Sequence, residues 1–495
     1  MRVLVIALLL SAIAGSFAYR TEKTSAQNVA PKLYSIRSDA KPAVDGAKSS
    51  IASVREAEIT FDMQGQSLAA AEGITVPLFD GKQFDARVRE TERRALDDVT
   101  WRGKIQYAKT DGDIIITFRK GYYSALIYGP NSVYEIIPRG EKHMLVELDQ
   151  SRFPECGGGV AGDRNDTTPP SSAALVGVDS ADRIDVLVVY TTATKNFLGG
   201  DAQAQAHAQA AVDAANTAYL NSRIRQRLRL VNSQEFVYTE SGNASTDLSN
   251  LRSNAGIGTL RNTFNADLVA EMSEVTDVCG IGYLMGAATG NQNNAFTVTA
   301  RSCAVGNLSF AHELGHNMGS QHNPENGSGP TFPYGFGHNV NGSYRTVMAY
   351  VDPCTSGCVR VAYFSNPNVI YLGTPTGINN ARDNARSINN TADVITAYRY
   401  SGSSITMSNF NGGDWLPRNI SRDVTWSSDN ITGNVRIDIS RDESTTWETL
   451  IASTPNDGTA RINVGGRPTR RARLRVVSLG IPTVSDSSVT NVSIR

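Results

Sequence analysis

The sequence predicts a protein of three parts, of which the central one has an α/β (α+β) fold. Strand and helix patterns alternate between Ile184 and Ala300, short β-rich runs precede them between Asp113 and Glu147, and alternating strands follow Ser401. Alternation of strands and helices is typical of layered α/β domains, whereas short strands separated by turns form antiparallel sheets. The chain has 495 residues, 40% hydrophobic and 19% charged, which is enough for about three domains.

The amino terminus has the pattern of a signal peptide over residues 1–18. Met1-Arg2 supplies a positive charge, Val3–Ala14 is apolar, and Ser16-Phe17-Ala18 offers small residues for cleavage. No later segment is apolar over the length of a membrane span, so we expect a secreted protein, extracellular or periplasmic in transit, with no membrane span. The net charge of −1 gives no electrostatic reason to expect nucleic acid as a partner.

Residues 19–178 are predicted to contain a β-rich part and a linker. The runs Ile114–Phe118, Tyr122–Tyr128 and Met144–Leu148 are separated by turn residues and predict a small antiparallel meander. The polar, proline-bearing segment Gly162–Ser172 follows them. Exposed segments of this composition are where proteolytic cleavage concentrates. We therefore expect a maturation cleavage within the residues that follow Cys156 and precede Arg183.

Residues 179–400 are predicted to form the central α/β domain. Its first strand is a continuous apolar run, its first helix is alanine-rich and long, and its last strand is expected at a sheet edge. In chain order the elements are strand Ile184–Tyr190, helix Asp201–Ser222, strand Gln226–Glu240, strand Asp267–Glu271 and edge strand Asn294–Ala300.

An eleven-residue run after the edge strand, His312 to His322, has the spacing of a metal site. His312 and His316 stand four apart and project from one face of a helix, and Glu313 beside them can reach a metal-bound water. Gly319 allows the helix to stop and the chain to turn, which brings His322 up as a third ligand. Three imidazoles leave one coordination position open, as in catalytic zinc sites, so we expect one Zn²⁺. The alternative is a surface helix with solvated histidines.

The chain has three further histidines outside this run. We interpret these as surface or packing residues: His143, His207 and His338.

A methionine follows the zinc motif in the run Thr346-Val347-Met348-Ala349-Tyr350. The extended motif followed by Met348 resembles the metzincin zinc endopeptidases, in which such a Met-turn forms a hydrophobic base beneath the metal; without the motif, Met348 would be core filler. In the astacin-like and serralysin-like groups a tyrosine at this position stabilises the transition state, so the resemblance implies that Tyr350 is an oxyanion donor. The alternative is a buried tyrosine with a satisfied hydroxyl.

The resemblance implies a secreted zinc-dependent endopeptidase that acts on protein or peptide substrates. The three histidines hold the ion, Glu313 is the general base toward the zinc-activated water, and the edge strand binds the substrate as an added strand. Two alternatives stay open: a secreted adhesion or binding protein whose metzincin domain is inactive, and a metzincin protease with apolar specificity.

Four segments resemble one branch in particular, the bacterial peptidyl-Asp metalloendopeptidases: Asp185–Thr191, Gly280–Met285, the zinc motif and Tyr363–Pro367. The zinc portion also resembles the reprolysin group. In that group aspartate usually follows the third histidine, whereas this chain has Asn323.

The peptidyl-Asp branch cleaves on the amino side of aspartate, which implies a cation in the specificity pocket. A buried carboxylate is costly without a partner, and an arginine fork is a suitable one. The candidates are Arg345 and Arg360, with Arg301 as a weaker third. Each of them, taken alone, is also consistent with a surface charge, and the sequence does not choose among them.

Cysteines of an exported protein are expected to form disulfides, so four of the five cysteines here can pair. We predict disulfides Cys279–Cys303 and Cys354–Cys358, although four cysteines allow three pairings. Cys156 is left over, and three glycines follow it. In several metzincins a propeptide cysteine occupies the open zinc position, so the resemblance implies that Cys156 is a latch, that residues 19–178 are a propeptide and that the protein is a zymogen. The alternative is an inert or oxidised thiol in a discarded segment.

Residues 401–495 are predicted to form an all-β sandwich. Their alternating strands are spaced by Asn/Asp/Gly turns, and the region resembles the immunoglobulin-like or fibronectin-like appendages of secreted bacterial enzymes. Three of the four tryptophans, Trp415, Trp426 and Trp447, fall here. We expect them to pack in the core; the alternative is that they let this domain contact a surface or polymer.

Overall fold

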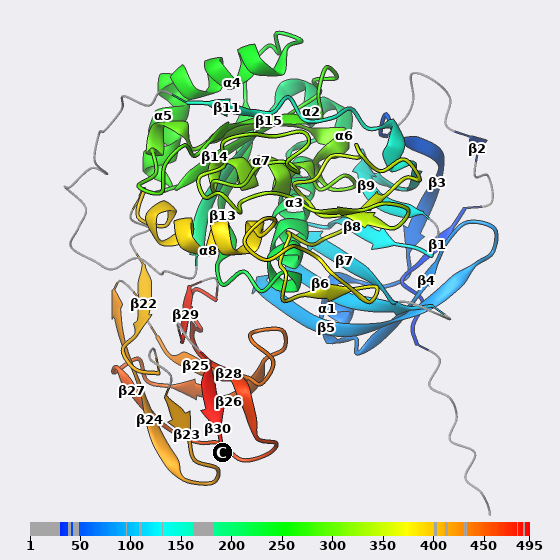
Figure 1. Cartoon of the computed structure of the whole chain (residues 1–495). Helices are drawn as coiled ribbons and strands as arrows, with labels where there is room; N and C mark the ends of the chain where they lie inside the picture. Colours follow the sequence, from blue (N-terminus) through cyan, green and yellow to red (C-terminus); the bar gives the residue numbers. More distant parts are fainter. Residues whose placement is uncertain are drawn as a thin grey trace, which may run out of the picture.

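The structure is a computed structural model that describes residues 30–37, 41–42, 49–95, 97–107, 111–130, 132–162, 183–399, 403–410, 414–429, 431, 433–482, 484–488 and 491–495. The predicted signal peptide and residues 163–172 of the predicted linker lie outside these residues. Figure 1 shows an N-terminal β-sheet in blue and cyan, a central part in green and yellow, and a C-terminal β part in orange and red. Within the described residues, no helix has the length and apolarity that a membrane span requires.

The N-terminal part is one ten-stranded antiparallel sheet with the order β1-β3-β10-β9-β8-β7-β6-β5-β4, in which β2 also pairs with β3. Its elements are β1 (Tyr34–Ile36), β2 (Lys41–Pro42), β3 (Ser53–Phe61), α1 (Gly65–Ala70), β4 (Gly73–Pro77), β5 (Gln83–Ala95), β6 (Asp98–Gln106), β7 (Asp111–Arg119), β8 (Tyr122–Tyr128), β9 (Val133–Arg139) and β10 (Lys142–Leu148). The three predicted strands lie in β7, β8 and β10. The prediction of a small meander was wrong about size, because the sheet already begins at Tyr34.

The two faces of this sheet pack in different cores, as the alternation of side chains along a strand requires. Ile114 and Ile116 of β7 belong to a core that contains only N-terminal residues. Ile115 between them, together with Leu126 and Ile137, belongs to the core of the central part. The N-terminal sheet and the central part are therefore packed on each other.

The central part contains a six-stranded sheet with the order β11-β15-β16-β14-β12-β13. All neighbours pair in parallel except β15 and β16. The strands are β11 (Gly159–Ala161), β12 (Arg183–Thr191), β13 (Arg227–Phe236), β14 (Leu268–Ser273), β15 (Gly280–Leu284) and β16 (Phe296–Ala300), and the helices are α2 (Thr192–Leu198), α3 (Asp201–Asn221), α4 (Ala244–Ser253), α5 (Ala255–Thr263), α6 (Arg301–Ala304), α7 (Ser309–Asn317) and α8 (Asn384–Ile395). Short strands follow α7: β17 (Asn339–Val340), β18 (Tyr344–Arg345), β19 (Val359–Arg360), β20 (Ile370–Tyr371) and β21 (Thr374–Pro375).

The prediction that Asn294–Ala300 forms an edge strand was wrong. This segment is β16, which lies inside the sheet between β14 and β15. The side of β15 that β16 leaves free is covered by β11, which runs parallel to it, with Gly159 opposite Gly282. A strand from before the central part therefore occupies the position at which the sheet would otherwise end.

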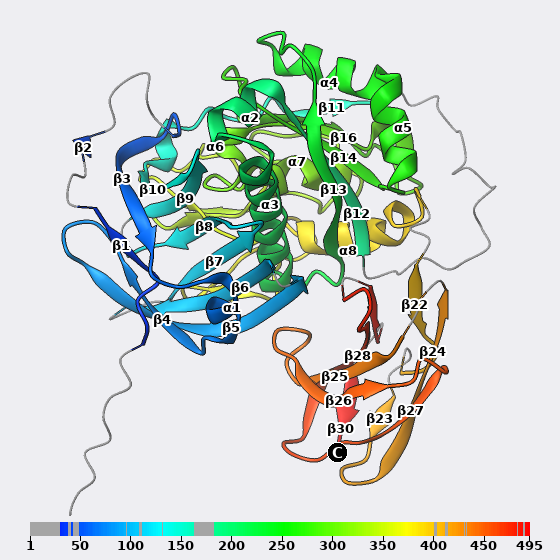
Figure 2. The ribbon, with the colours of Figure 1, turned by 180° about the vertical axis from the view of Figure 1, so that it is seen from behind.

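Helix α3 lies between the N-terminal sheet and the central sheet, as Figure 2 shows. Alanines make up much of its length, which allows both sheets to approach closely, and most of its side chains are buried. Several of its polar residues face the N-terminal sheet: Asp213 accepts hydrogen bonds from Thr117 at 2.7 Å and from Arg102 at 3.3 Å. Because an unpaired buried carboxylate is costly, this network specifies how the two parts dock.

The two predicted disulfides are present, Cys279–Cys303 and Cys354–Cys358. The first joins the residue before β15 to helix α6, and the second closes a short loop. Cys156 is the free cysteine.

The C-terminal part consists of two sheets, β22-β24-β27 and β23-β30-β28-β25-β26, with β29 paired to β28. The strands are β22 (Ser404–Met407), β23 (Trp415–Leu416), β24 (Ser421–Asp429), β25 (Val435–Ser440), β26 (Glu448–Thr454), β27 (Thr459–Asn463), β28 (Thr469–Ser478), β29 (Ser485–Ser487) and β30 (Val492–Ile494). Trp426 is buried in the core, and Trp447 packs under Arg475. Trp415 is 52% exposed, so the expectation of core packing was wrong for that residue.

Candidate metal centre

Helix α7 presents His312 and His316 on one face, and both are buried. The helix stops at the predicted place: Gly319 has a φ of 79°, and a Cβ atom there would lie 2.3 Å from the hydroxyl of Thr331. Only glycine fits this turn without strain. The turn returns the chain so that His322 faces the other two histidines, with the Nε2 atoms of His316 and His322 3.1 Å apart.

Each of the three imidazoles is oriented by a backbone carbonyl. The Nδ1 atoms lie 2.8 Å from the oxygen of Val347 for His312, 3.0 Å from that of Ser320 for His316, and 3.3 Å from that of Asn326 for His322. Since a carbonyl only accepts, each Nδ1 carries the hydrogen and each Nε2 presents a lone pair. Burial lowers the pKa of His316 to about 4 and that of His322 to about 2, so both rings are neutral at pH 7.

The Nε2 atoms converge on one point together with the thiol of Cys156. One ligand atom from each of these four residues lies within 4.8 Å of the others. The Nε2 atom of His312 is buried and has no hydrogen-bond partner in the described part of the chain. Facing lone pairs without a shared hydrogen are unfavourable unless a cation lies between them. The donor set, three nitrogens and a sulfur, therefore fits a bound metal ion such as zinc.

Met348 lies directly beneath helix α7. It is buried, and a Cβ atom at Gly315 would lie 2.4 Å from its sulfur. Gly315 directly precedes His316, so a larger residue there would push the helix off this sulfur. The methionine thus supports the helix turn that carries two of the histidines.

The Cys156 segment enters the site from the side of β15. The Cys156 thiol lies 3.4 Å from a carboxylate oxygen of Glu313 and 3.7 Å from Nε2 of His316. A Cβ atom at Gly159 would lie 2.9 Å from the ring of His316, so glycine is what allows the backbone to approach this closely. Burial, with the nearby Glu313 charge, raises the pKa of the Cys156 thiol well above its usual range.

Glu313 points toward β15 and the Cys156 thiol rather than joining the histidine cluster. Burial raises its pKa to about 8. A Cβ atom at Gly280 would lie 2.6 Å from the Glu313 carboxylate. Gly280 thus provides the space in which the carboxylate lies. The sequence did not reveal the importance of Gly280 for the site, because Gly280 was recognised only as part of a segment that resembles the family.

Tyr350 lies over His322, with ring centroids 4.0 Å apart. Its hydroxyl donates to the backbone oxygen of Cys156 at 2.7 Å. Its backbone amide donates to the side-chain oxygen of Asn323 at 2.9 Å, and the Asn323 amide donates to the oxygen of Asp352 at 2.9 Å. Asn323 therefore ties the loop after Met348 to the third histidine. Its structural role was also missed, although its departure from the reprolysin pattern drew attention to it.

Arg345 and Arg360 are both buried behind this loop, so a surface position, which the sequence allowed for each, is wrong. Both guanidinium groups donate to the backbone oxygen of Ala349, at 3.0 Å and 3.3 Å. Burial lowers the pKa of Arg345 to about 9, and it lowers that of Arg360. Arg301 lies elsewhere, paired with Glu274 and stacked on Phe197. The structure thus brings together Arg345 and Arg360, and not Arg301.

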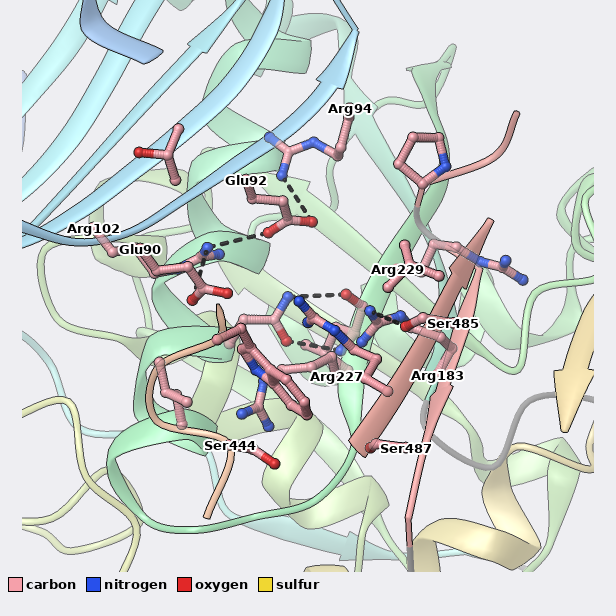
Figure 3. Close-up of a pocket in the computed structure, with 18 of the residues that line it drawn as sticks. Glu90, Glu92, Arg94, Arg102, Arg183, Arg227, Arg229, Ser444, Ser485 and Ser487 are labelled. Atoms are coloured by element: carbon pink, nitrogen blue, oxygen red, sulfur yellow. Dashed lines mark hydrogen bonds and ion pairs between the residues drawn. The ribbon is translucent and has the colours of Figure 1, made fainter. Parts of the chain in front are cut away.

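A second, arginine-rich cavity lies away from the metal centre, where β5, β13 and β28 meet (Figure 3). Some of its arginines form ion pairs: Arg102 pairs with Glu92 at 3.1 Å and with Glu90 at 3.7 Å, and Arg229 pairs with Asp185. The cavity is a junction between the three parts of the chain rather than an extension of the metal centre.

Comparison with known proteins gives consistent matches. A family model described as Reprolysin_5, metallo-peptidase family M12, matches residues 180–365. The peptidyl-Asp metalloendopeptidase of Stenotrophomonas maltophilia strain R551-3 is 33% identical over 368 residues, which cover 70% of this chain and 84% of that protein. A protein of the same name from Xanthomonas campestris pv. campestris is 35% identical over 278 residues, covering 54% and 65%. One from Pseudomonas fragi is 32% identical over 189 residues, covering 37% and 99%.

The matched residues 180–365 include the three histidines, Glu313, Met348 and Tyr350. Residues 180–365 therefore match metallopeptidase family M12. The chain belongs to the same family as these peptidyl-Asp metalloendopeptidases, and it is a metalloendopeptidase that acts on protein or peptide substrates.

Proposed function

We propose that the chain is a secreted zinc endopeptidase that is made as a latent precursor and cleaves on the amino side of aspartate. The observation that carries the proposal is the convergence of Cys156, His312, His316 and His322 within 4.8 Å, with Glu313 beside the thiol. A cysteine from the N-terminal part is at the fourth position of a three-histidine site. This arrangement is what a latch requires.

His312, His316 and His322 would hold zinc through their Nε2 atoms, and the three carbonyls behind their Nδ1 atoms fix the rings. When bound, zinc supplies Lewis-acid chemistry: it polarises the scissile carbonyl and acidifies a water molecule. Glu313 takes a proton at its carboxylate and returns it to the leaving amine. Its burial favours this role, because it raises the pKa of the carboxyl and so makes the carboxylate a stronger base.

Tyr350 and Met348 have supporting roles in this proposal. The Tyr350 hydroxyl holds the Cys156 carbonyl in the latent chain. Once that segment leaves, the same hydroxyl is free to donate to the oxyanion of a reacting peptide. Met348 forms the apolar base beneath helix α7.

We propose that the chain is divided into signal peptide 1–18, propeptide 19–178, metzincin protease domain 179–400 and immunoglobulin-like or fibronectin-like sandwich 401–495. In this division the propeptide keeps the precursor latent. The propeptide adds strand β11 to β15 while Cys156 blocks the metal. Its removal would free that side of β15, so an extended substrate could pair there through its main chain. The substrate strand thus belongs to β15 rather than to β16.

Specificity for aspartate is assigned to Arg345 and Arg360. Their guanidinium groups converge on the loop between Met348 and Tyr350, next to the histidine cluster. A buried pair of cations favours a substrate carboxylate over an apolar side chain, because the carboxylate offsets charges that are costly to leave unpaired.

Metal removal tests the activity itself. We expect the processed secreted protein to cleave a denatured protein, a chelator to abolish the cleavage, and added zinc to restore it. Mass spectrometry of the new amino termini should show enrichment of aspartate. Enrichment of bulky apolar residues would instead favour a protease of apolar specificity, and metal binding without any cleavage would favour a binding protein.

The space at Gly280 gives a further prediction. Gly280→Ala places a methyl group 2.6 Å from the Glu313 carboxylate. The displaced base is expected to lower kcat/KM of the processed enzyme by about one hundredfold. The matched control is Gly286→Ala, because a Cβ atom there has no heavy atom within 4 Å. Equal kcat/KM values for the two variants would show that the position of Glu313 does not limit the reaction.

A further inference from the structure

The two buried arginines behind the Met348 loop lack a close counter-charge. Among the described residues neither Arg345 nor Arg360 forms an ion pair, and the Nε atom of each is buried without a partner. Each positive charge makes the burial of the other less favourable, because the positive charge of Arg360 lowers the pKa of Arg345. Two buried like charges that share one carbonyl oxygen require negative charge nearby.

Glu155, the residue before the latch cysteine, is placed to supply that charge. Among the groups that raise the pKa of Arg345 and of Arg360, Glu155 has the largest effect in both cases. Its side-chain oxygen accepts from the amide of Val351 at 3.4 Å. Val351 is two residues beyond Ala349, whose carbonyl both arginines share. The Glu155 carboxylate therefore lies at the end of the loop behind which the cations converge.

The backbone around Glu155 keeps the side chain on this side of the metal centre. The backbone oxygen of Glu155 accepts from the amide of Cys279 at 3.2 Å, and the Gly157 amide donates to the backbone oxygen of Gly280 at 2.8 Å. The segment then continues in parallel with β15 through β11. Cys156 thus lies among the histidines, β11 runs along β15, and Glu155 lies beside the loop that covers the arginines.

We propose that Glu155 is a built-in substitute for the acidic side chain of the substrate. The propeptide then blocks two subsites at once, the metal through Cys156 and the acid-selective pocket through Glu155. This inference rests on the proposed function and adds to it: the arginines that select an acidic residue in the substrate are the same ones that hold the propeptide. Departure of the propeptide leaves both cations without Glu155, which makes an acidic side chain the favoured replacement.

The first test uses the full-length chain and needs no catalytic activity. Cys156 is the free cysteine, so its alkylation by iodoacetamide reports opening of the segment. Glu155→Gln is expected to speed alkylation by about fivefold, the size of a partly buried charge interaction, whereas Glu155→Asp stays within about twofold of the parent. The matched control is Glu141→Gln, an exposed glutamate in the β9–β10 turn. Alkylation of Glu155→Gln at the parental rate would overturn the proposal.

A second measurement shows whether Glu155 acts through the arginines. In an Arg345→Gln background, the effect of Glu155→Gln is expected to shrink to less than about twofold. Since loss of a buried arginine could prevent folding, ionic strength provides an independent check on folded protein: the effect of Glu155→Gln should be smaller in 0.5 M NaCl than in 10 mM NaCl. An effect that is unchanged by both treatments would mean that Glu155 holds the segment only through its contact with Val351.

A third measurement separates this inference from the proposed function. In a Cys156→Ser chain, adding Glu155→Gln is expected to lower the KM for an aspartate-containing peptide by about three- to tenfold with little change in kcat, because a competitor leaves the pocket. Cleavage with an unchanged KM would refute the role of Glu155 while the proposed protease activity stands. Absence of cleavage in every variant would refute the activity, and the alkylation rates would still decide the role of Glu155.

Discussion

Replacement of Glu313 by glutamine is expected to lower kcat for peptide hydrolysis by between about one hundredfold and ten thousandfold. The amide has the shape of the carboxyl and fits the space left by Gly280, but it cannot take up a proton. Glu313 is not one of the four residues whose ligand atoms converge, so the variant should bind zinc as the parent does. Both quantities are measurable, kcat with an aspartate-containing peptide and zinc content by elemental analysis.

The control for this variant is His322→Ala, which removes a ligand and should lose both zinc and activity. A Glu313→Gln enzyme whose kcat stays within about tenfold of the parent would refute the general-base role. Loss of zinc from that variant would place Glu313 among the metal ligands instead.

Replacement of Cys156 by serine is expected to make the unprocessed, full-length chain active. Serine keeps the size of the side chain but is a poor ligand for zinc, whereas the Cys156 thiol lies among the three histidines. Hydrolysis by the full-length chain should rise at least about tenfold, the factor that corresponds to loss of a contact worth about 1.4 kcal/mol. The measurement is the initial rate before any cleavage product of the chain itself is visible.

Glu141→Gln again provides a control, because Glu141 lies in the same N-terminal part, in the exposed β9–β10 turn, and does not belong to the metal centre. Strand β11 would still cover β15 in the Cys156→Ser chain. A variant that stays latent would therefore show that strand addition, rather than the thiol, blocks the substrate.

Local patterns predicted much of the fold. Helix α3 ends within one residue of its predicted span, and the strands that became β7, β8, β10, β12 and β14 were recognised from apolar or alternating runs. Strand β5 was not, because Gln83–Ala95 is dominated by charged residues. Two of its residues, Glu92 and Arg94, belong to ion pairs that involve Arg102 of β6 and Asp213 of α3. A strand stabilised by partners on other elements carries no apolar alternation of its own.

Local sequence patterns also did not predict the order of the strands in the central sheet. Nothing in Asn294–Ala300 indicates whether the strand has one neighbour or two. Strand β15 precedes β16 in the chain yet lies beyond it in the sheet, and β11 comes from more than one hundred residues earlier. Strand order follows from long-range pairing, which an apolar run does not encode.

The sequence by itself determined the arrangement of the candidate metal centre. His312, Glu313, His316 and His322 lie within eleven residues, so helix geometry and one glycine turn are enough to bring them together. The tertiary structure alone decided how the residues around them are arranged. Cys156, Gly280, Arg345 and Arg360 come from four separate segments, and the contacts between them depend on which strands pair and which loops pack. Strand pairing and loop packing depend on free-energy differences summed over the whole fold, which no short run of residues determines.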